Sequence, residues 1–160
     1  MFRRLLATTD DITPLIARVV LGLVILPHAL QKTLGLFGGY GFDGTVGFMT
    51  SQGIPLAFAV LAIVAELAGS LGLVLGLIGR VASFGVASVM TVAALMVHRG
   101  HFFMNWTGTQ GGEGFEFHLL ALALASIVMV RGSGRWSLDR AISNVTMPRL
   151  SSATPSPASI

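Results

Sequence analysis

The chain has 160 residues, of which 53% are hydrophobic and only 11% are charged, and its mean hydropathy is +0.80. A soluble domain usually carries about 25% charged residues, so this composition excludes a soluble globular protein and predicts a polytopic membrane protein. The formal net charge is +3, and no basic stripe with interleaved aromatics points to nucleic acid as a partner. The chain has no cysteine, which excludes disulfides, a thiolate nucleophile and iron–sulfur ligation by its own residues.

The first long apolar run predicts a membrane-spanning helix over residues 14 to 36. A bilayer core about 30 Å thick requires about 20 apolar residues in a helix, and this run is long enough. Pro14 suits the first position of a helix, whereas Pro27 inside the run predicts a kink.

Two further spans are predicted over residues 55 to 79 and 81 to 98. Almost no sequence separates them, so we expect Gly79 and Arg80 to form a tight turn between antiparallel neighbours. Small residues supply the surfaces on which we expect these helices to pack, namely Ala62, Ala65, Gly69, Gly72 and Gly76 on one span and Gly85 and Ser88 on the next.

A fourth span is predicted over residues 115 to 131, and it is short for a full crossing unless Arg131 snorkels and Glu116 lies among headgroups or faces protein. A short interfacial helix is expected near residues 137 to 144, and the sequence after about residue 150 is expected to be disordered. The predicted organisation is an N-terminal segment over 1 to 13, a four-helix domain over 14 to 131 and a C-terminal segment over 132 to 160.

The distribution of positive charge predicts the orientation. Only Lys32 and Arg99 lie near one side of the predicted spans, and the other side carries Arg3, Arg4, Arg80, Arg131, Arg135, Arg140 and Arg149. The positive-inside rule then places both termini in the cytoplasm and the two long connections outside. The predicted fold is therefore an all-α, multi-pass four-helix bundle in a bacterial inner membrane.

Glu66 and Arg18 are ionisable residues within the predicted spans. A charge at the centre of a membrane helix costs about 2.5 to 3.5 kcal/mol, so Glu66 must be protonated, paired or exposed to a hydrated cavity. Arg18 could snorkel to the surface or reach Glu66 on the neighbouring helix. An assembly role and a functional role are both open for this carboxylate.

Several polar residues converge on the outer level of the predicted bundle. His28, Gln31 and Lys32 share one helix face, because their spacing is i, i+3, i+4. Lys32, Arg99 and Glu113 are most simply interpreted as interfacial charges. The same level receives His98, Arg99, His101, Glu113, Glu116 and His118 from the ends of the other spans. Trp106 and two phenylalanines in the following loop are typical of an interfacial aromatic belt, although that loop could also fold back as a lid.

The order of several motifs resembles the DoxX family of small four-helix membrane proteins. These motifs are GLVILPHALQKTLG, AELAGSLGLVLGLIGRVAS, GGEGFEFHLL and GRWSLDR, and the resemblance covers about residues 14 to 141. Related DoxD-type proteins form the membrane subunit of an archaeal thiosulfate:quinone oxidoreductase, and bacterial relatives are linked to oxidative, thiol and quinone stress. The positions that match the family's polar pattern are His28, Gln31, Lys32, Glu66, Arg80 and residues 112 to 116.

The leading functional hypothesis is a subunit or accessory protein of a membrane redox system, with a quinone as its small partner and membrane or peripheral redox proteins as further partners. A quinone site needs lipid access, hydrogen-bond donors and a proton relay. In this hypothesis His28, Glu66 and His98 are catalytic. Arg18 and Arg80 are structural, no residue is assigned to a metal, and the residues expected to bind substrate are Gln31, Lys32, Glu116 and His118.

Other classes of function stay open. The histidine layer could ligate a metal or haem, although no ligand motif has a diagnostic spacing. A non-catalytic scaffold or assembly factor would use Glu66 and Arg18 for assembly alone. A small transporter is a further alternative, but four helices without an inverted repeat are a poor basis for transport unless they form a homo-oligomer. Whether the chain is an enzyme is therefore not decided by its sequence.

Overall fold

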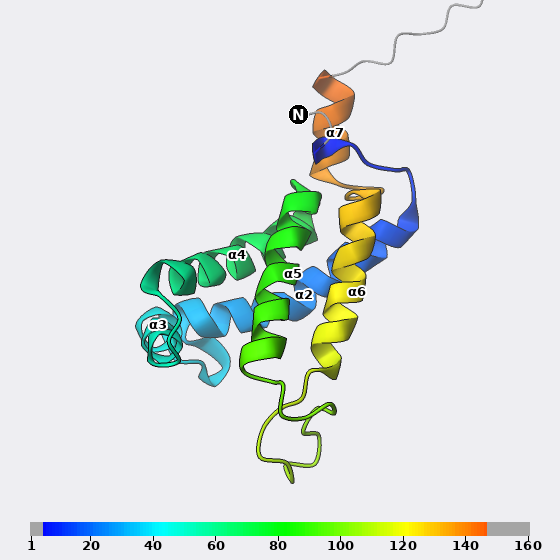
Figure 1. Cartoon of the computed structure of the whole chain (residues 1–160). Coiled ribbons are helices and arrows are strands. Elements are labelled where there is room, and N and C mark those ends of the chain that lie inside the picture. Colours follow the sequence, from blue (N-terminus) through cyan, green and yellow to red (C-terminus); the bar gives the residue numbers. More distant parts are fainter. Residues whose placement is uncertain (1–4, 147–160) are drawn as a thin grey trace, which may run out of the picture.

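A computed structural model describes residues 5 to 146 of the chain, and the predicted disorder after about residue 150 lies outside this part. All regular secondary structure in the described part is helical, which confirms the predicted all-α class. The elements in Figure 1 are α2 (Ile12–Leu34), the 3-10 turn η1 (Leu36–Gly38), α3 (Gly41–Ser51), α4 (Leu56–Leu75), α5 (Gly79–Met96), α6 (Glu116–Arg131) and α7 (Leu138–Thr146).

Three of these helices, α2, α4 and α5, are long and apolar enough to cross a membrane. Helix α6 has 16 residues. At about 1.5 Å per residue it is about 24 Å long, which is shorter than a hydrocarbon core of about 30 Å. The structure thus supports a membrane protein with three candidate spans.

Helices α2, α4, α5 and α6 surround one apolar core. Both α2 and α5 contact α4 and α6, so each helix touches two of the other three. In the view of Figure 1, α5 and α6 run side by side, and α2 and α4 run across their direction. The core includes Leu21, Ile25, Val86, Ala125 and Val128, all of them buried. Large apolar side chains also cover the outside of these helices, as expected for a surface that faces lipid.

Small residues allow close contacts between the first helices. A Cβ atom added at Gly22 of α2 would lie 2.8 Å from Val74 Cγ2, and one added at Gly69 of α4 would lie 2.8 Å from Val86 Cγ2. At these separations a Cβ atom would force its neighbours to shift, so α2 packs closely on α4 and α4 on α5. Farther along the same helices, the small residues line a groove instead, as described below.

Two connections differ from the sequence prediction. The turn between α4 and α5 lies at residues 76 to 78 and not at Gly79 and Arg80, because Gly76 adopts a left-handed conformation with φ of 67° and ends α4. The connection after α2 was expected to be a plain outer loop, but it contains helix α3. Helix α3 packs against both α2 and α4, and it forms one wall of the groove.

Candidate functional site

A largely apolar groove of about 860 Å³ lies between α3, α4 and α5. Small residues form its floor, namely Ala62 and Ala65 on α4 and Gly85 and Ser88 on α5. Along α5 the groove extends from Phe84 to Met96, which corresponds to about 18 Å of helix at about 1.5 Å per residue. The side chains of Phe48, Phe58, Leu61, Phe84 and Val92 also line it. Its shape suits an elongated apolar molecule.

One end of the groove is polar. Gln31 and Lys32 of α2 line it there, together with His98 and Arg99, which follow the end of α5. Gln31 donates its amide Nε2–H to the carbonyl oxygen of Phe37 at 3.2 Å, and this bond ties the side chain to the turn after α2. The groove thus combines an apolar length with a cationic end.

Lys32 forms an ion pair with Glu66 at this end. The ammonium Nζ lies 2.6 Å from both carboxylate oxygens. The Glu66 side chain has 0% exposure and the Lys32 side chain has 30%, so the carboxylate lies behind the lysine as seen from the groove. Pairing explains how a carboxylate is accommodated midway along an apolar helix, because an unpaired charge there would lose its hydration without compensation.

Arg18 does not reach Glu66, and it is not extended into solvent either. Helices α2 and α4 run antiparallel, so Arg18 near the start of α2 meets the last turn of α4, whereas Lys32 near the end of α2 meets Glu66. The buried guanidinium donates only to carbonyl oxygens, at 2.9 Å to Leu73, 2.6 Å to Val74, 2.8 Å to Ser133, 2.7 Å to Trp136 and 3.4 Å to Arg135. The Arg18–Glu66 ion pair that the sequence left open is therefore not formed, and Lys32 takes the place of Arg18 beside Glu66.

Arg80 and Asp139 connect three helix ends on the Arg18 side of the molecule. Arg80 donates to the carbonyl oxygens of Met129 and Val130 in the last turn of α6, and to that of Ala7. The buried Asp139 carboxylate accepts from the backbone N–H groups of residues 78 and 79 at 2.6 and 3.0 Å, where α5 begins, and from Ser133 Oγ at 2.5 Å. Sequence reasoning missed Asp139, although it lies in the family-like GRWSLDR motif.

Two imidazoles are in contact beside the polar end of the groove. The ring centroids of His98 and His118 are 4.6 Å apart, and the rings are inclined by 37°. His98 lines the groove, and its Nδ1 lies 3.2 Å from the carbonyl oxygen of Glu113. His118 on α6 is only 5% exposed, and its Nδ1 has no hydrogen-bond partner within residues 5 to 146. An unsatisfied buried polar atom costs about 1 to 3 kcal/mol, so this nitrogen marks a place where a hydrogen-bonding group would be favourable.

The remaining predicted site residues lie outside the groove. His28 is exposed, and its ring centroid is 6.0 Å from that of Phe117. Glu116 holds the loop between α5 and α6, since its Oε1 accepts from the backbone N–H of Met104 at 2.9 Å and from Trp106 Nε1 at 3.3 Å. The structure therefore pairs Lys32 with Glu66 and His98 with His118, and it places Gln31, Lys32 and His98 on the groove lining, to which His28 and Glu116 do not belong.

Within the part of the chain that the structure describes, no group of three or more His, Cys, Asp or Glu side chains is arranged to hold a metal ion. The two imidazoles in contact belong to different helices, α6 and the end of α5, and they are joined by ring packing. Each neutral imidazole has one nitrogen that donates a hydrogen bond and one that accepts a hydrogen bond.

Comparisons with known proteins agree with the resemblance found in the sequence. A family model described as DoxX matches residues 13–99, which is more than half of the chain. The chain is also similar to "Inner membrane protein YphA" of Escherichia coli (strain K12), with 29% identity over 132 residues that cover 79% of this chain and 87% of the relative. No solved structure matches the chain. The family match includes the Lys32–Glu66 pair and the groove walls, but it ends before Glu116 and His118.

Proposed function

The chain belongs to the DoxX family, and we propose that it is an integral membrane component of a redox system with a quinone as its small partner. Its three candidate membrane spans agree with the location of its relative, which is named as an inner membrane protein. Redox proteins that deliver or receive electrons would be its partners, because the chain has no cysteine with which to carry electrons itself.

In this proposal α6 is a fourth span and both termini are cytoplasmic. Helix α6 shares the apolar core with the three longer helices. The Arg131 side chain at its end is 60% exposed, so it can extend toward headgroups and lengthen a short span. The contacts of Arg80 with α6 place Arg80 and Arg131 at the same end of the molecule, and a common cytoplasmic side for these arginines follows the positive-inside rule.

The groove between α3, α4 and α5 is the observation that carries the quinone proposal. A quinone has a long apolar tail and a ring with two carbonyl oxygens, so it needs an apolar channel that ends in hydrogen-bond donors. The groove is apolar along α5, and it ends at the Lys32 ammonium and the Gln31 amide. We infer that the tail lies along Ala62, Ala65 and Ser88 and that Lys32 donates to a ring carbonyl.

Protons for the ring would pass through the groups behind this end. Reduction of a quinone to a quinol takes two electrons, which we assign to a partner protein, and two protons. His98 lines the groove and contacts His118, while Glu66 lies behind Lys32, so each can exchange a proton with the ring or with its neighbour. In this scheme Glu116 acts only by holding the loop between α5 and α6, and the exposed His28, which lies against Phe117 of α6, has no direct contact with the groove.

A matched pair of serines tests the groove directly. Ser88 and Ser126 are both exposed helix residues whose Oγ donates to the carbonyl four residues earlier at 2.8 Å, but only Ser88 lines the groove. We expect Ser88→Leu in the full chain to weaken binding of a short-chain benzoquinone by at least about tenfold, with Ser126→Leu unchanged. Binding would be measured on purified protein in lipid nanodiscs. Equal affinities of the two variants, or no binding by the native chain, would contradict the proposal.

A non-catalytic scaffold is the alternative that the Lys32–Glu66 pair would also serve, because this pair joins α2 to α4. A scaffold role predicts that Glu66→Gln changes the amount of assembled complex but leaves quinone turnover per complex unchanged. The redox role predicts a loss of turnover per complex, so the two proposals differ in one measurement.

A further inference from the structure

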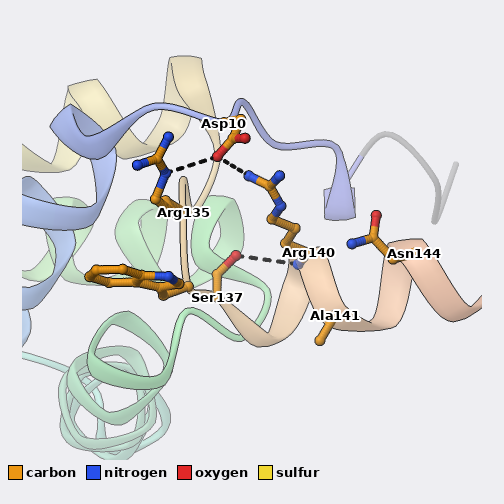
Figure 2. Close-up of a pocket in the computed structure, with 7 residues that line it drawn as sticks. Asp10, Arg135, Ser137, Arg140, Ala141 and Asn144 are labelled. Atoms are coloured by element: carbon orange, nitrogen blue, oxygen red, sulfur yellow. Dashed lines mark hydrogen bonds and ion pairs between the residues drawn. The ribbon is translucent and has the colours of Figure 1, made fainter.

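A second pocket, of about 450 Å³, lies at the opposite end of α2 from the quinone groove. It is formed where the segment before α2 meets the start of α7, as Figure 2 shows. Its lining includes Asp10, Arg135, Trp136, Arg140 and Asn144. None of these residues has a part in the function proposed above.

The pocket carries an excess of positive charge. Asp10 Oδ1 accepts from Arg135 Nε at 3.0 Å and also contacts the Arg140 guanidinium, and Figure 2 shows both arginines reaching this one carboxylate. Hydrogen bonds from Arg140 and then Arg135 hold the pKa of the Asp10 carboxyl below its usual value, so it stays ionised at neutral pH. Two guanidinium groups against one carboxylate leave one unit of positive charge, and each guanidinium has five N–H donors.

The backbone around the arginines is fixed by internal hydrogen bonds. The Trp136 carbonyl accepts from buried Arg18 at 2.7 Å. Ser137 Oγ donates to the Gly134 carbonyl at 2.8 Å and accepts from the Arg140 N–H at 3.2 Å. Arg135 is therefore presented by an ordered turn between α6 and α7 and Arg140 by the first turns of α7, which reduces the entropy that a ligand must overcome on binding.

The position of the pocket corresponds to headgroup depth if α6 crosses the membrane as proposed. Arg135 lies four residues beyond Arg131, where α6 ends. Trp136 is 78% exposed beside the pocket, and exposed Trp together with Arg is typical of a membrane interface. The nearest abundant ligand at this depth is a phospholipid headgroup.

We propose that this pocket binds the phosphate of an anionic phospholipid from the adjacent leaflet. Guanidinium groups match phosphate oxygens in paired hydrogen bonds, and basic pockets beside membrane helices bind anionic headgroups. A zwitterionic headgroup brings no net charge to balance the second arginine, so the anionic lipid is favoured. Asp10 keeps the two arginines oriented and competes in part with the lipid phosphate. The proposal depends on the proposed crossing of α6, but not on quinone binding.

Fluorescence of Trp136 gives a local measurement of lipid binding. The chain has two tryptophans, so Trp106→Phe leaves Trp136 as the single emitter in the full chain. We expect brominated phosphatidylglycerol to quench Trp136 at a mole fraction at least about fivefold lower than brominated phosphatidylcholine does. Arg135→Gln and Arg140→Gln should each weaken this preference and together abolish it, whereas the control Arg99→Gln, which removes one charge outside the pocket as each single variant does within it, should keep it.

Asp10→Asn tests the proposal in the opposite direction. It removes the competing negative charge, and the Asn side-chain oxygen can still accept hydrogen bonds from the two arginines, so we expect an increased preference for phosphatidylglycerol. Glycerol 3-phosphate added to phosphatidylcholine nanodiscs distinguishes a lipid from a soluble phosphate, and we expect no change in Trp136 emission. Equal quenching by the two lipids, a lost preference in the control variant, a decreased preference in Asp10→Asn or a response to the soluble phosphate would each overturn the proposal. The Ser88 experiment is unaffected by any of these outcomes.

Discussion

Replacement of Lys32 by Met should destabilise the protein strongly, because Lys32 is the only ion-pair partner of Glu66 in the described part of the chain. Both carboxylate oxygens lie 2.6 Å from Nζ, and the carboxylate has 0% exposure. A buried charge that loses its partner costs about 3 to 5 kcal/mol. At about 2 to 4 °C per kcal/mol for a chain of this size, Lys32→Met should lower the melting temperature by about 10 °C.

Adding Glu66→Leu to Lys32→Met should restore at least about half of this lost stability. In the single variant Glu66→Leu the lysine remains partly exposed and can turn toward the groove, so the free energy of unfolding should fall by only about 1 to 2 kcal/mol. The double variant should recover at least about half of the stability that Lys32→Met loses, since no charge is then left buried. Arg99→Met, which removes a groove cation that has no ion pair with a described residue, is the control and should cost about 0.5 kcal/mol or less. Thermal unfolding in detergent would be measured for the native chain and these four variants. The pairing argument would be refuted if Lys32→Met were as stable as the native chain, or if the double variant were less stable than Lys32→Met.

Three further predictions concern the same unfolding measurement. Arg18→Met should lower the free energy of unfolding by about 3 to 5 kcal/mol, because it leaves four close carbonyl oxygens without their donor. Arg18→Lys should lose less stability than Arg18→Met but should not reach that of the native chain. An unchanged melting temperature in Arg18→Met would contradict the observed contacts. Gly22→Ala should lower the free energy of unfolding by about 1 to 3 kcal/mol, since its Cβ would lie 2.9 Å from the Ser70 carbonyl oxygen. The control Gly47→Ala meets nothing within 4 Å and should be neutral or slightly stabilising. If Gly47→Ala were the more destabilising of the two, the α2–α4 contact would not be tight. The pKa of Asp10 is lower in the folded than in the unfolded chain, so the contribution of its carboxylate to stability is complete above the unfolded pKa of about 4 and is lost as the pH falls through the folded pKa. The difference in melting temperature between the native chain and Asp10→Asn should therefore shrink below about pH 4 and stay constant above it.

The long apolar helices could be predicted from the sequence because their signal is local. Runs of apolar residues locate α2, α4 and α5 without any knowledge of their neighbours. Helix α3 was not predicted, since its sequence GFDGTVGFMTS has three glycines and a weak intrinsic preference for helix. Contacts with α2 and α4 stabilise this helix, and such contacts depend on the assembled fold. The turn at residues 76 to 78 was misplaced for a related reason, because several glycines compete for the left-handed position and only Gly76 takes it.

The candidate site could be predicted by residue type but not by pairing. The spacing of His28, Gln31 and Lys32 identified one polar helix face, and Glu66 was identified as a buried charge that needs a partner. Which cation meets Glu66 depends on the relative shift of α2 and α4, and a single sequence does not encode that shift in any local pattern. Ala65 and Gly85 line the groove and have almost no side chain to fill it, although their helices are in contact there, with the Ala65 Cβ 3.6 Å from a Cβ built at Gly85. The same small residues had been interpreted only as packing surface.

Photolabelling with a benzoquinone that carries a photoreactive tail would test most directly the proposal that the groove between α3, α4 and α5 binds a quinone. The full chain in lipid nanodiscs would be irradiated with the probe, digested and mapped by mass spectrometry. Labels should concentrate on the groove walls around Ala62 and Ser88, and an excess of unlabelled quinone should remove them. Labels that spread equally over exposed α6 residues such as Leu120, or that resist competition, would show that the probe is dissolved in lipid and that the groove does not bind quinone.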